Sequence, residues 1–394
     1  MFGLGKSRIY MDYASAPPVL HAAVAAVRDA ERYIGNPGAI HHEGAEALAA
    51  LEGARERIAA QLSVRPREVV FTSGLTESNN LAIVGYARAL ERMRRGLAGT
   101  HWVVSAIEHA SVLDCFGEVE RMGGTVTHVS ADSKGRITPS AVGAVLRPET
   151  VFVSAGWANN ETGVIQPLNK LREVLDTHAR QHGTRIVLHS DAGQAPLYLK
   201  STAHSLGVDL LSIGSNKLYG PHGIGALYVR NTADLARVLF GGPQERRLRP
   251  GTESVALALG FAAAYEHIAH ERESEAERLC VIRDSMAQAM TERVPGLVIN
   301  GSLEHALPHM LNVSIPHTQS EYVALALDRA GIAISTKSAC REGEESESHV
   351  IAALGLEPWR AKTSLRFSLG RKTTSRDAAR TVDALAAIVN KHRA

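Results

Sequence analysis

The sequence predicts an α/β protein, with a three-layer α/β/α large domain built on a mostly parallel sheet and a smaller α+β domain. Short β-branched runs alternate with longer helical patterns, which is typical of βαβ units. After Thr252 the pattern changes to one very long helical stretch, followed by short strands and helices. A chain of 394 residues is also long enough for two domains of ordinary size.

The large domain is expected to alternate strands and helices. The predicted strands lie at 68–72, 101–106, 125–129, 150–155, 185–190, 208–213 and 224–229. The helical patterns between them lie at 76–94, 111–122, 167–181 and 201–206. Because parallel neighbours are joined by crossover helices, the strands should form one sheet that is covered on both faces.

The smaller domain is expected to begin with a helix rich in Ala, Glu and Arg, from 253 to about 294. Its other elements are strands at 297–300 and 310–315, a helix at 320–330, strands at 332–335 and 364–369, and a helix at 376–391. The extended N-terminal stretch 9–13 is assigned to this domain. The predicted division is therefore 15–255 for the large domain, and 1–14 with 256–394 for the small one.

The composition excludes several classes of function. The chain is 45% hydrophobic and 21% charged, and its 43 basic residues are scattered among 41 acidic ones, so the basic footprint of a nucleic-acid-binding protein is missing. The first residues lack the apolar core of a signal peptide, and no apolar run approaches the ~18 residues that span a bilayer, so we expect a cytoplasmic protein without a membrane partner. Three separated cysteines with no CxxC pair argue against a zinc site and against structural disulfides.

The turn Thr72–Ser78, which contains Gly74, is a candidate anion-binding site between a strand and a helix. Its backbone N–H groups and the Thr76 hydroxyl should point at one spot, together with the positive end of the helix dipole. The alternative is an ordinary helix start, with Thr76 as N-cap and Glu77 in the first turn.

Lys217 and Asp191 are the candidate catalytic pair. Each residue follows an apolar strand, and the C-terminal ends of such strands face the crevice where open α/β sheets bind ligands. A buried lysine suits imine formation, and a carboxylate can keep a pyridine nitrogen protonated, so the pair indicates pyridoxal phosphate. The alternatives are a structural salt bridge for Asp191 and a solvent-facing Lys217. Gln194, one turn after Asp191, could reach the same ligand, although a lone glutamine is usually solvated.

Cys340 differs from the two other cysteines, because it lies in a polar segment without apolar periodicity. Free cysteines are usually buried small hydrophobes, which fits Cys115 and Cys280 in their helical patterns. Lys337 and Arg341 favour a Cys340 thiolate and four downstream glutamates oppose it, so little net change in its pKa is expected. We therefore expect a mobile thiol that ionises when it reaches a cationic pocket.

Ten motifs in order make the whole chain resemble the cysteine desulfurases of the class V aminotransferase family. They are Tyr10–Tyr13, Gly35–Pro37, Thr72–Ser78, Glu108–His109, Asn159–Gly163, Asp191–Gln194, Lys217–Gly225, Arg249–Thr252, Ser338–Cys340 and Arg366–Gly370. The resemblance implies the fold-type I architecture of pyridoxal phosphate enzymes, a homodimer, and conversion of L-cysteine to L-alanine with the sulfur left as an enzyme persulfide. It also implies a sulfur-acceptor protein, such as an iron–sulfur scaffold or a thiolation enzyme.

The same resemblance implies which residues hold the cofactor. Lys217 forms the imine, Asp191 pairs with the pyridinium nitrogen, and Gln194 contacts the phenolic oxygen. His109 stacks on the ring and shuttles protons, a role that an imidazole suits near neutral pH. The phosphate site is expected to comprise Gly74, Thr76, Ser215 and, across the dimer, Thr252.

For the substrate, the resemblance implies that Asn160 and Arg366 take the carboxylate, which a planar guanidinium matches in a two-pronged fashion. Asn160 is also expected to contact the cofactor. Asn36 and His41 are expected to line the pocket. Cys340 is expected to receive the sulfur, and it is also a possible contact for an iron–sulfur cluster during transfer, although no resident metal is expected.

Some positions depart from the family. Relatives have a serine and a histidine aimed at the phosphate, where this chain has Gly214 and Asn216. Two charge-assisted hydrogen bonds of ~1.5–3 kcal/mol each are at stake, so we expect weaker cofactor retention. Lys337 also replaces a glycine, and Ala16–Pro17 replaces a threonine pair. The alternatives are therefore a selenocysteine lyase, another class V transaminase or lyase, and a catalytically degenerate binding homologue.

Overall fold

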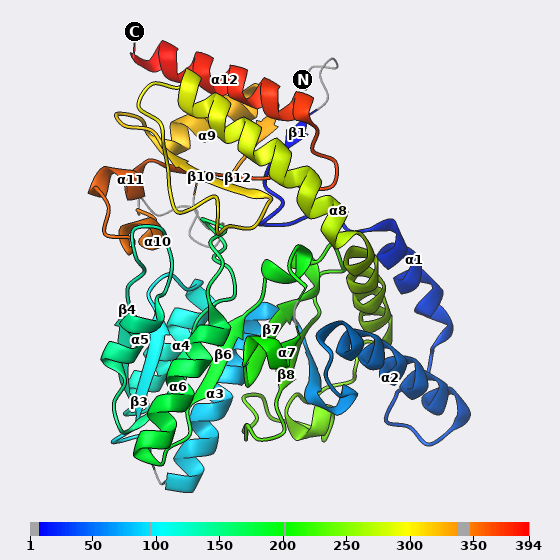
Figure 1. Cartoon of the computed structure of the whole chain (residues 1–394). Coiled ribbons are helices and arrows are strands. Elements are labelled where there is room, and N and C mark those ends of the chain that lie inside the picture. Colours follow the sequence, from blue (N-terminus) through cyan, green and yellow to red (C-terminus); the bar gives the residue numbers. More distant parts are fainter. Residues whose placement is uncertain (1–7, 95, 201, 337–346, 394) are drawn as a thin grey trace.

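The computed structural model describes residues 8–94, 96–200, 202–336 and 347–393. Figure 1 shows a larger body around a seven-stranded sheet and, above it, a smaller body around a three-stranded sheet. In the described ranges the large sheet has the order β2-β8-β7-β6-β5-β3-β4. Its strands are β2 Val69–Thr72, β3 His101–Ser105, β4 Thr125–Val129, β5 Thr150–Ser154, β6 Val187–Asp191, β7 Leu210–Gly214 and β8 Gly225–Val229.

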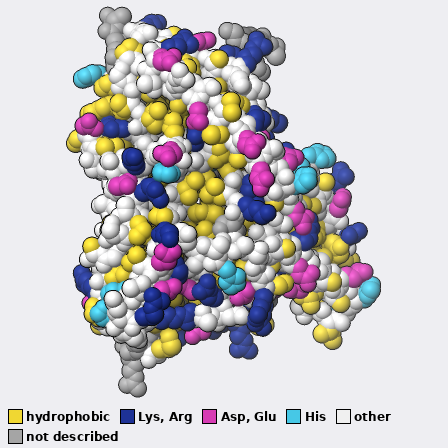
Figure 2. Space-filling view, viewed as in Figure 1, with side chains coloured by type: hydrophobic (Ala, Val, Ile, Leu, Met, Phe, Trp, Pro, Cys, Tyr) yellow, Lys and Arg dark blue, Asp and Glu magenta, His cyan; other side chains and the backbone are white. Residues whose placement is uncertain are grey.

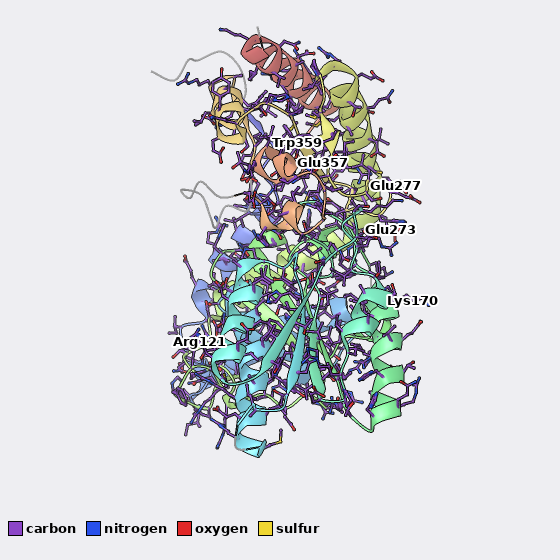
Figure 3. All side chains as sticks on the ribbon, turned by 90° about the vertical axis from the view of Figure 1, so that its left-hand side faces the viewer. Arg121, Lys170, Glu273, Glu277, Glu357 and Trp359 are labelled. Atoms are coloured by element: carbon purple, nitrogen blue, oxygen red, sulfur yellow. The ribbon has the colours of Figure 1, made fainter. Side chains whose placement is uncertain are left out.

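The large sheet confirms the predicted α/β class. Strand β8 runs antiparallel to both of its neighbours, and the other adjacent pairs are parallel. Figure 3 views the sheet from its side, with α4 (Arg121) and α6 (Lys170) covering opposite faces. The helices that follow its strands are α3 Leu75–Arg94, α4 Ala110–Arg121, α5 Pro139–Val145, α6 Leu168–His182 and α7 Ala203–Leu206.

The core under α3 and α4 is aromatic. Trp102 and Phe152, from neighbouring strands, lie 5.0 Å apart between ring centroids, and Phe116 from α4 meets Trp102 edge-on at 6.3 Å. All three side chains are completely buried. Such offset and edge-to-face pairs add to the stabilisation from burial alone, and they fix α4 against the sheet.

Helix α8, Val255–Arg293, confirms the predicted long helix, and it runs along both bodies (Figure 1). Its N-terminal part packs on α1 His21–Asp29 and α2 His42–Leu62, which the sequence analysis did not include. The buried residues of α2 follow helical spacing, but some of them are alanines, which give only a weak apolar signal in the sequence. They include Ala47, Leu51, Ala54, Ile58 and Leu62.

The smaller body contains an antiparallel sheet of order β12-β10-β9. Strand β1 pairs in parallel with β11, so the N-terminal segment joins this body. The exact division of the chain into domains stays a prediction. The elements are β1 Ile9–Tyr10, β9 Val298–Ile299, β10 Met310–Ser314, α9 Ser320–Arg329, β11 Ile332–Ala333, α10 His349–Ala352, α11 Pro358–Lys362, β12 Ser364–Ser368 and α12 Ser375–Arg393.

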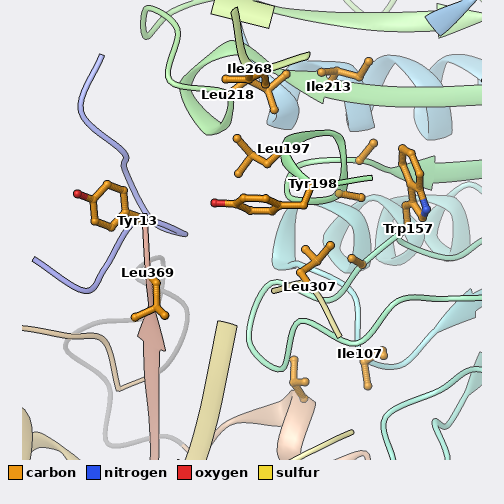
Figure 4. Close-up of a cluster of buried hydrophobic side chains, with 14 of the residues drawn as sticks. Tyr13, Ile107, Trp157, Leu197, Tyr198, Ile213, Leu218, Ile268, Leu307 and Leu369 are labelled. Carbon is orange, nitrogen blue, oxygen red and sulfur yellow. The ribbon is translucent and has the colours of Figure 1, made fainter. Parts of the chain in front are cut away.

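The two bodies share a hydrophobic core. Figure 4 shows Tyr13 and Leu369 on one side of it, facing Leu197, Tyr198 and Leu307. All five belong to one cluster of buried residues. On the surface, charged side chains of both signs are mixed, and hydrophobic ones gather at the middle of the face in Figure 2. Among the described helices, none is both long and apolar enough to cross a membrane.

Candidate active site

One cavity of about 400 Å³ lies at the C-terminal ends of the parallel strands. Going across the sheet, Lys217 follows β7, Asp191 ends β6, Asn160 follows β5 and His109 follows β3. Parallel strands end at the same edge, which is why residues far apart in sequence meet here. The sequence-predicted residues that line the cavity are Gly74, Thr76, His109, Asn160, Asp191, Gln194, Lys217 and Arg366.

Lys217 is held by the N-terminal segment. It ends a 3₁₀ turn, Ser215–Lys217, directly after β7. Its Nζ donates hydrogen bonds to the backbone oxygens of Ala14 at 3.0 Å and Ser15 at 2.7 Å. These two carbonyls position the amine on the wall of the cavity, between the large body and the segment that leads to the small one.

Asp191 is oriented by two donors from different elements. One carboxylate oxygen accepts from the Gly193 backbone N–H at 2.8 Å, and the other accepts from Asn79 Nδ2, on α3, at 2.8 Å. Each carboxylate oxygen has the capacity for more than one hydrogen bond. The carboxylate is therefore fixed in direction and can still accept a donor from a ligand.

His109 caps the N-terminus of α4. Its Nδ1 accepts from the Ser111 backbone N–H at 3.1 Å and lies 2.9 Å from Ser111 Oγ. Burial lowers the pKa of His109, the charge of Asp191 opposes that change, and the charge of Lys217 adds to it. The arrangement favours a neutral imidazole in the cavity wall.

Glu108 is a buried carboxyl group near the partly buried Asp191. Its Oε1 accepts from the Gly156 backbone N–H at 2.8 Å, and its own carbonyl oxygen lies 2.9 Å from His349 Nε2. Burial raises the pKa of Glu108 to about 7, and the charge of Asp191 also raises it. Glu108 can therefore gain or lose a proton near neutral pH.

Arg366 reaches the cavity from the central part of β12. Its guanidinium donates to the Asn160 carbonyl at 2.9 Å, to Asp12 Oδ1 at 2.8 Å and to Ser15 Oγ at 2.5 Å. Its Nε is buried and has no hydrogen-bond partner among the described residues. Buried donors of this kind normally have a partner, so a carboxylate ligand would satisfy it.

Four predicted residues are not part of this cavity in the single chain. Ser215 is buried beside it, whereas Asn36, His41 and Thr252 are exposed outside it. His41 caps α2 and Asn36 Oδ1 accepts from the Gly38 backbone N–H. Cys340 lies outside the described residues, as does Lys337. The roles of all these residues stay predictions.

At the start of α3 the cavity wall contains an apolar side chain. Gly74 has a φ of 151°, which favours glycine, and the space where a Cβ would lie is open. Leu75 fills the neighbouring space: a Cβ at Gly214 would lie 2.7 Å from Leu75 Cγ, and one at Gly193 would lie 2.9 Å from Leu75 Cδ1. A serine at position 214, which the resemblance to the family implies, has no room unless Leu75 moves.

Sequence reasoning missed several residues that contact the candidate ones. Asp12 and Glu108 lie inside two of the ten motifs but were given no role, and Ser15 lies two residues after the first motif. Asn79 had a signal, because it lies one helical turn after Thr76 and therefore on the same face of α3. The contact between Ser15 and Arg366 joins residues 351 positions apart, and nothing in the local pattern predicts it.

A lysine, an aspartate and a histidine at the C-terminal ends of strands in one sheet, joined by an arginine from a second body, define an enzyme of the aminotransferase type. The chain belongs to the class-V aminotransferase family, whose model matches residues 9–381. It is 37% identical over 389 residues to "Cysteine desulfurase IscS" of Dictyoglomus turgidum, covering 98% of this chain and 96% of that protein. It is 36% identical to "Cysteine desulfurase IscS 1" of Archaeoglobus fulgidus, covering 98% and 97%.

Two solved structures share the fold. One is described as a NifS-like protein, with a TM-score of 0.89 and 28% identity, covering 98% of this chain and all of that one. Another, "SspA in complex with cysteine", has a TM-score of 0.78 and 34% identity, covering 92% of this chain and 98% of that one. The predicted resemblance to the cysteine desulfurases and the predicted fold are both confirmed.

The cavity residues fit pyridoxal phosphate, the cofactor that the family implies. Gln194 Nε2 donates to the Ala14 carbonyl at 2.9 Å, while its buried Oε1 has no partner among the described residues. A polar ligand in the cavity would satisfy that atom. The Thr76 hydroxyl and the N–H groups in the first turn of α3 suit a phosphate, and Asp191 suits a ring N–H.

Proposed function

We propose that the chain is a pyridoxal phosphate-dependent cysteine desulfurase, which converts L-cysteine to L-alanine and transfers the sulfur to Cys340. The observation that carries the proposal is one cavity that contains Lys217, Asp191 and Arg366, in a chain whose relatives are named cysteine desulfurases. The solved relative with cysteine bound supports the same substrate.

The residues that would hold the cofactor follow from the cavity. Lys217 would hold it covalently, Asp191 would accept from its ring nitrogen, Gln194 would contact its phenolic oxygen and Thr76 would bind its phosphate. When bound, the cofactor supplies a sink for the electrons released at the α-carbon of an amino acid. Thr252 from a second copy of the chain would complete the phosphate site, which makes the proposed enzyme a homodimer.

Arg366 and Asn160 would bind the carboxylate of cysteine. The unsatisfied Nε of Arg366 adds a donor to the guanidinium fork, and its Asp12 and Ser15 contacts already fix the plane of that group. Charge-assisted, two-pronged bonds of this kind orient a carboxylate as well as attract it. The α-carbon would thereby be held near Lys217.

Two groups of the chain would then act on the substrate. Lys217 Nζ would accept the α-proton, a task for which its place on the cavity wall is suited. The thiolate of Cys340 would attack the substrate sulfur, so that an S–S bond forms and the Cβ–S bond breaks. The electron pair of the broken bond stays with the carbon skeleton, which is protonated and leaves as alanine, and the sulfur remains as a persulfide.

The persulfide sulfur would be passed to an acceptor protein in the cytoplasm, such as an iron–sulfur scaffold or an enzyme that thiolates tRNA or a cofactor. Where the resemblance implies a serine and a histidine, this chain has Gly214 and Asn216, which would leave the phosphate without a hydroxyl donor and an imidazole donor. Cofactor retention should therefore be weaker than in relatives.

The first experiment tests the lysine. The purified protein is loaded with pyridoxal phosphate, reduced with borohydride and digested, and the modified peptide is identified by mass spectrometry. We expect the adduct on Lys217 and no adduct at that peptide in Lys217→Ala. An adduct on another lysine would overturn the assignment, and no visible absorption after cofactor addition would indicate a degenerate binding homologue.

The second experiment tests the cysteine. Cys340→Ala should abolish transfer of sulfur from cysteine, whereas Cys280→Ala, on the outer part of α8, should retain it. Undiminished release of sulfide by Cys340→Ala would remove the persulfide mechanism. Activity of that variant on selenocysteine alone would favour the alternative of a selenocysteine lyase.

A further inference from the structure

A series of hydrogen bonds connects His109 to Asp191 through Asn79 and Ser111, two residues that the sequence analysis did not single out. Asn79 Nδ2 lies 2.8 Å from Asp191 Oδ2 and 3.0 Å from Ser111 Oγ. Ser111 Oγ lies 2.9 Å from His109 Nδ1. Asn79 is completely buried on α3, and Ser111 lies in the first turn of α4. These hydrogen bonds therefore join α3 and α4 at the wall of the cavity.

The direction of each bond follows from the chemistry of the atoms. An ionised carboxylate only accepts, so the amide nitrogen of Asn79 must face Asp191. The second hydrogen of that nitrogen is directed to Ser111 Oγ, which then accepts it and has its own hydrogen left to donate. That hydrogen is directed to His109 Nδ1, so Nδ1 is an acceptor.

A second donor occupies the same ring nitrogen. The backbone N–H of Ser111 points at His109 Nδ1 at 3.1 Å, and a backbone N–H cannot reverse its direction. A proton on Nδ1 would oppose this N–H and the Ser111 hydroxyl at once. The backbone N–H and the side-chain hydroxyl of Ser111 therefore both require an unprotonated Nδ1 on His109.

We propose that Asn79 and Ser111 are positioning residues that hold His109 as the neutral tautomer with its proton on Nε2. His109 then presents an N–H donor, and not a lone pair, for interaction with a bound group. The matching ligand atom is an acceptor, such as a phenolate or carbonyl oxygen or a thiolate. The same Asn79 amide donates to Asp191, so one side chain orients both the Asp191 carboxylate and, through Ser111, the His109 ring.

The charged groups around the ring enter the titration of His109 as well. Burial is the largest cause of its lowered pKa; Asp191 and Glu161 oppose the shift, and Lys217 and His349 add to it. Hydrogen bonds to the neutral form disfavour the charged form. Removing the Ser111 hydroxyl should therefore raise the pKa of His109, with those four groups unchanged.

The test is 15N NMR of the full chain labelled at histidine ring nitrogens, with the His109 signals assigned by their loss in His109→Gln. At neutral pH we expect one protonated and one unprotonated nitrogen, with the proton on Nε2. In Ser111→Ala, the pH at which His109 gains its second proton should shift upward. A parent ring with the proton on Nδ1, or an unchanged titration in Ser111→Ala, would overturn the proposal.

Matched variants separate positioning from general damage to the fold. Ser111→Thr retains the hydroxyl and should restore the parent titration. Asn79→Ala should shift it upward, while Asn80→Ala, whose side chain donates to the Thr76 carbonyl, should not. The effect on turnover rests on the proposed function, but the NMR readout does not. A parent protein with the expected spectrum and no desulfurase activity would therefore reject the function and leave the tautomer assignment intact.

Discussion

Arg366 Nη2 lies 2.8 Å from Asp12 Oδ1, and this ion pair fastens strand β12 to the segment that follows β1. The Arg366 side chain is 2% exposed and that of Asp12 is 19% exposed. Removing one partner of a largely buried pair leaves an uncompensated charge. We expect Asp12→Asn to lower the free energy of unfolding by about 2 to 4 kcal/mol, measured by urea denaturation.

An exposed aspartate provides the control for this variant. Asp328 pairs with Arg8, and both side chains are more than half exposed. Surface pairs contribute little, so Asp328→Asn should cost less than about 1 kcal/mol. Equal decreases in the free energy of unfolding of the two variants would show that the Arg366–Asp12 pair stabilises the fold no more than a surface pair does.

Glu108 should make stability depend on pH. Its pKa is raised to about 7, above its ordinary value of 4.5, because the carboxyl group is buried. The folded chain therefore binds a proton that the unfolded chain lacks between pH 4.5 and 7, and stability falls as the pH rises through this window. Glu108→Gln keeps an acceptor for the Gly156 N–H and has no proton to lose. The free energy of unfolding of the variant, relative to that of the parent, should therefore rise by up to about 3 kcal/mol from pH 5 to pH 8.

The measurement is a pair of denaturation curves at pH 5 and pH 8 for the parent and the variant, without cofactor. Glu173→Gln, at an exposed pair with Lys170, serves as the control and should show no such gain. A stability difference between Glu108→Gln and the parent that is the same at both pH values would contradict the raised pKa.

Leu75 should decide whether the phosphate end of the cavity tolerates a serine at position 214. A Cβ there would lie 2.7 Å from Leu75 Cγ, so Gly214→Ser alone should destabilise the fold by roughly 1 to 3 kcal/mol through overpacking. Adding Leu75→Ala should recover most of that loss, because the two side chains compete for one space.

Only the double variant Leu75→Ala/Gly214→Ser should also retain cofactor better than the parent, measured by the absorbance that survives dialysis. A Gly53→Ser change on α2, where a Cβ would meet nothing within 4 Å, is the control for adding a serine. Independent, additive effects of the two cavity substitutions would argue against the shared space.

Arg366→Lys should separate binding from chemistry. A lysine keeps the charge but loses the planar fork that matches a carboxylate. We expect KM for cysteine to rise about 10- to 100-fold with a smaller change in kcat, in line with one lost charge-assisted hydrogen bond of ~1.5–3 kcal/mol. Arg293→Lys, at an exposed pair with Asp383, should leave KM unchanged. A fall in kcat alone would place Arg366 away from the substrate carboxylate.

The fold was predictable wherever the local pattern carried the information. Most strands of the large sheet are short apolar runs next to a turn, and the residues after several of them meet in one cavity because parallel strands end at one edge. Helix α2 was missed since alanine contributes little apolar contrast. The packing of Leu75 against Gly214 was not predictable, because it depends on how α3 lies over the sheet.

The contacts that shape the candidate site were the least predictable part. Lys217 Nζ is held by backbone oxygens of Ala14 and Ser15, about 200 positions earlier, and backbone atoms have no signature in a sequence. The tautomer of His109 depends on a side chain of another helix, Asn79. Residue types indicate which chemistry is available, whereas the direction of each donor is a property of the folded chain.

The segment around Met11 pairs with strand β12, which is synthesised much later, so this part of the fold forms late. The Met11 carbonyl accepts from the Ser368 backbone N–H at 2.8 Å, so the start of the chain must wait for strand β12 before it finds its place. Domains generally fold as units while the chain emerges from the ribosome, but Met11 and its partner Ser368 in β12 are separated by 357 positions. The nascent protein therefore has no finished cavity until β12 has been synthesised, and a product without β12 would carry Lys217 with no arginine opposite it.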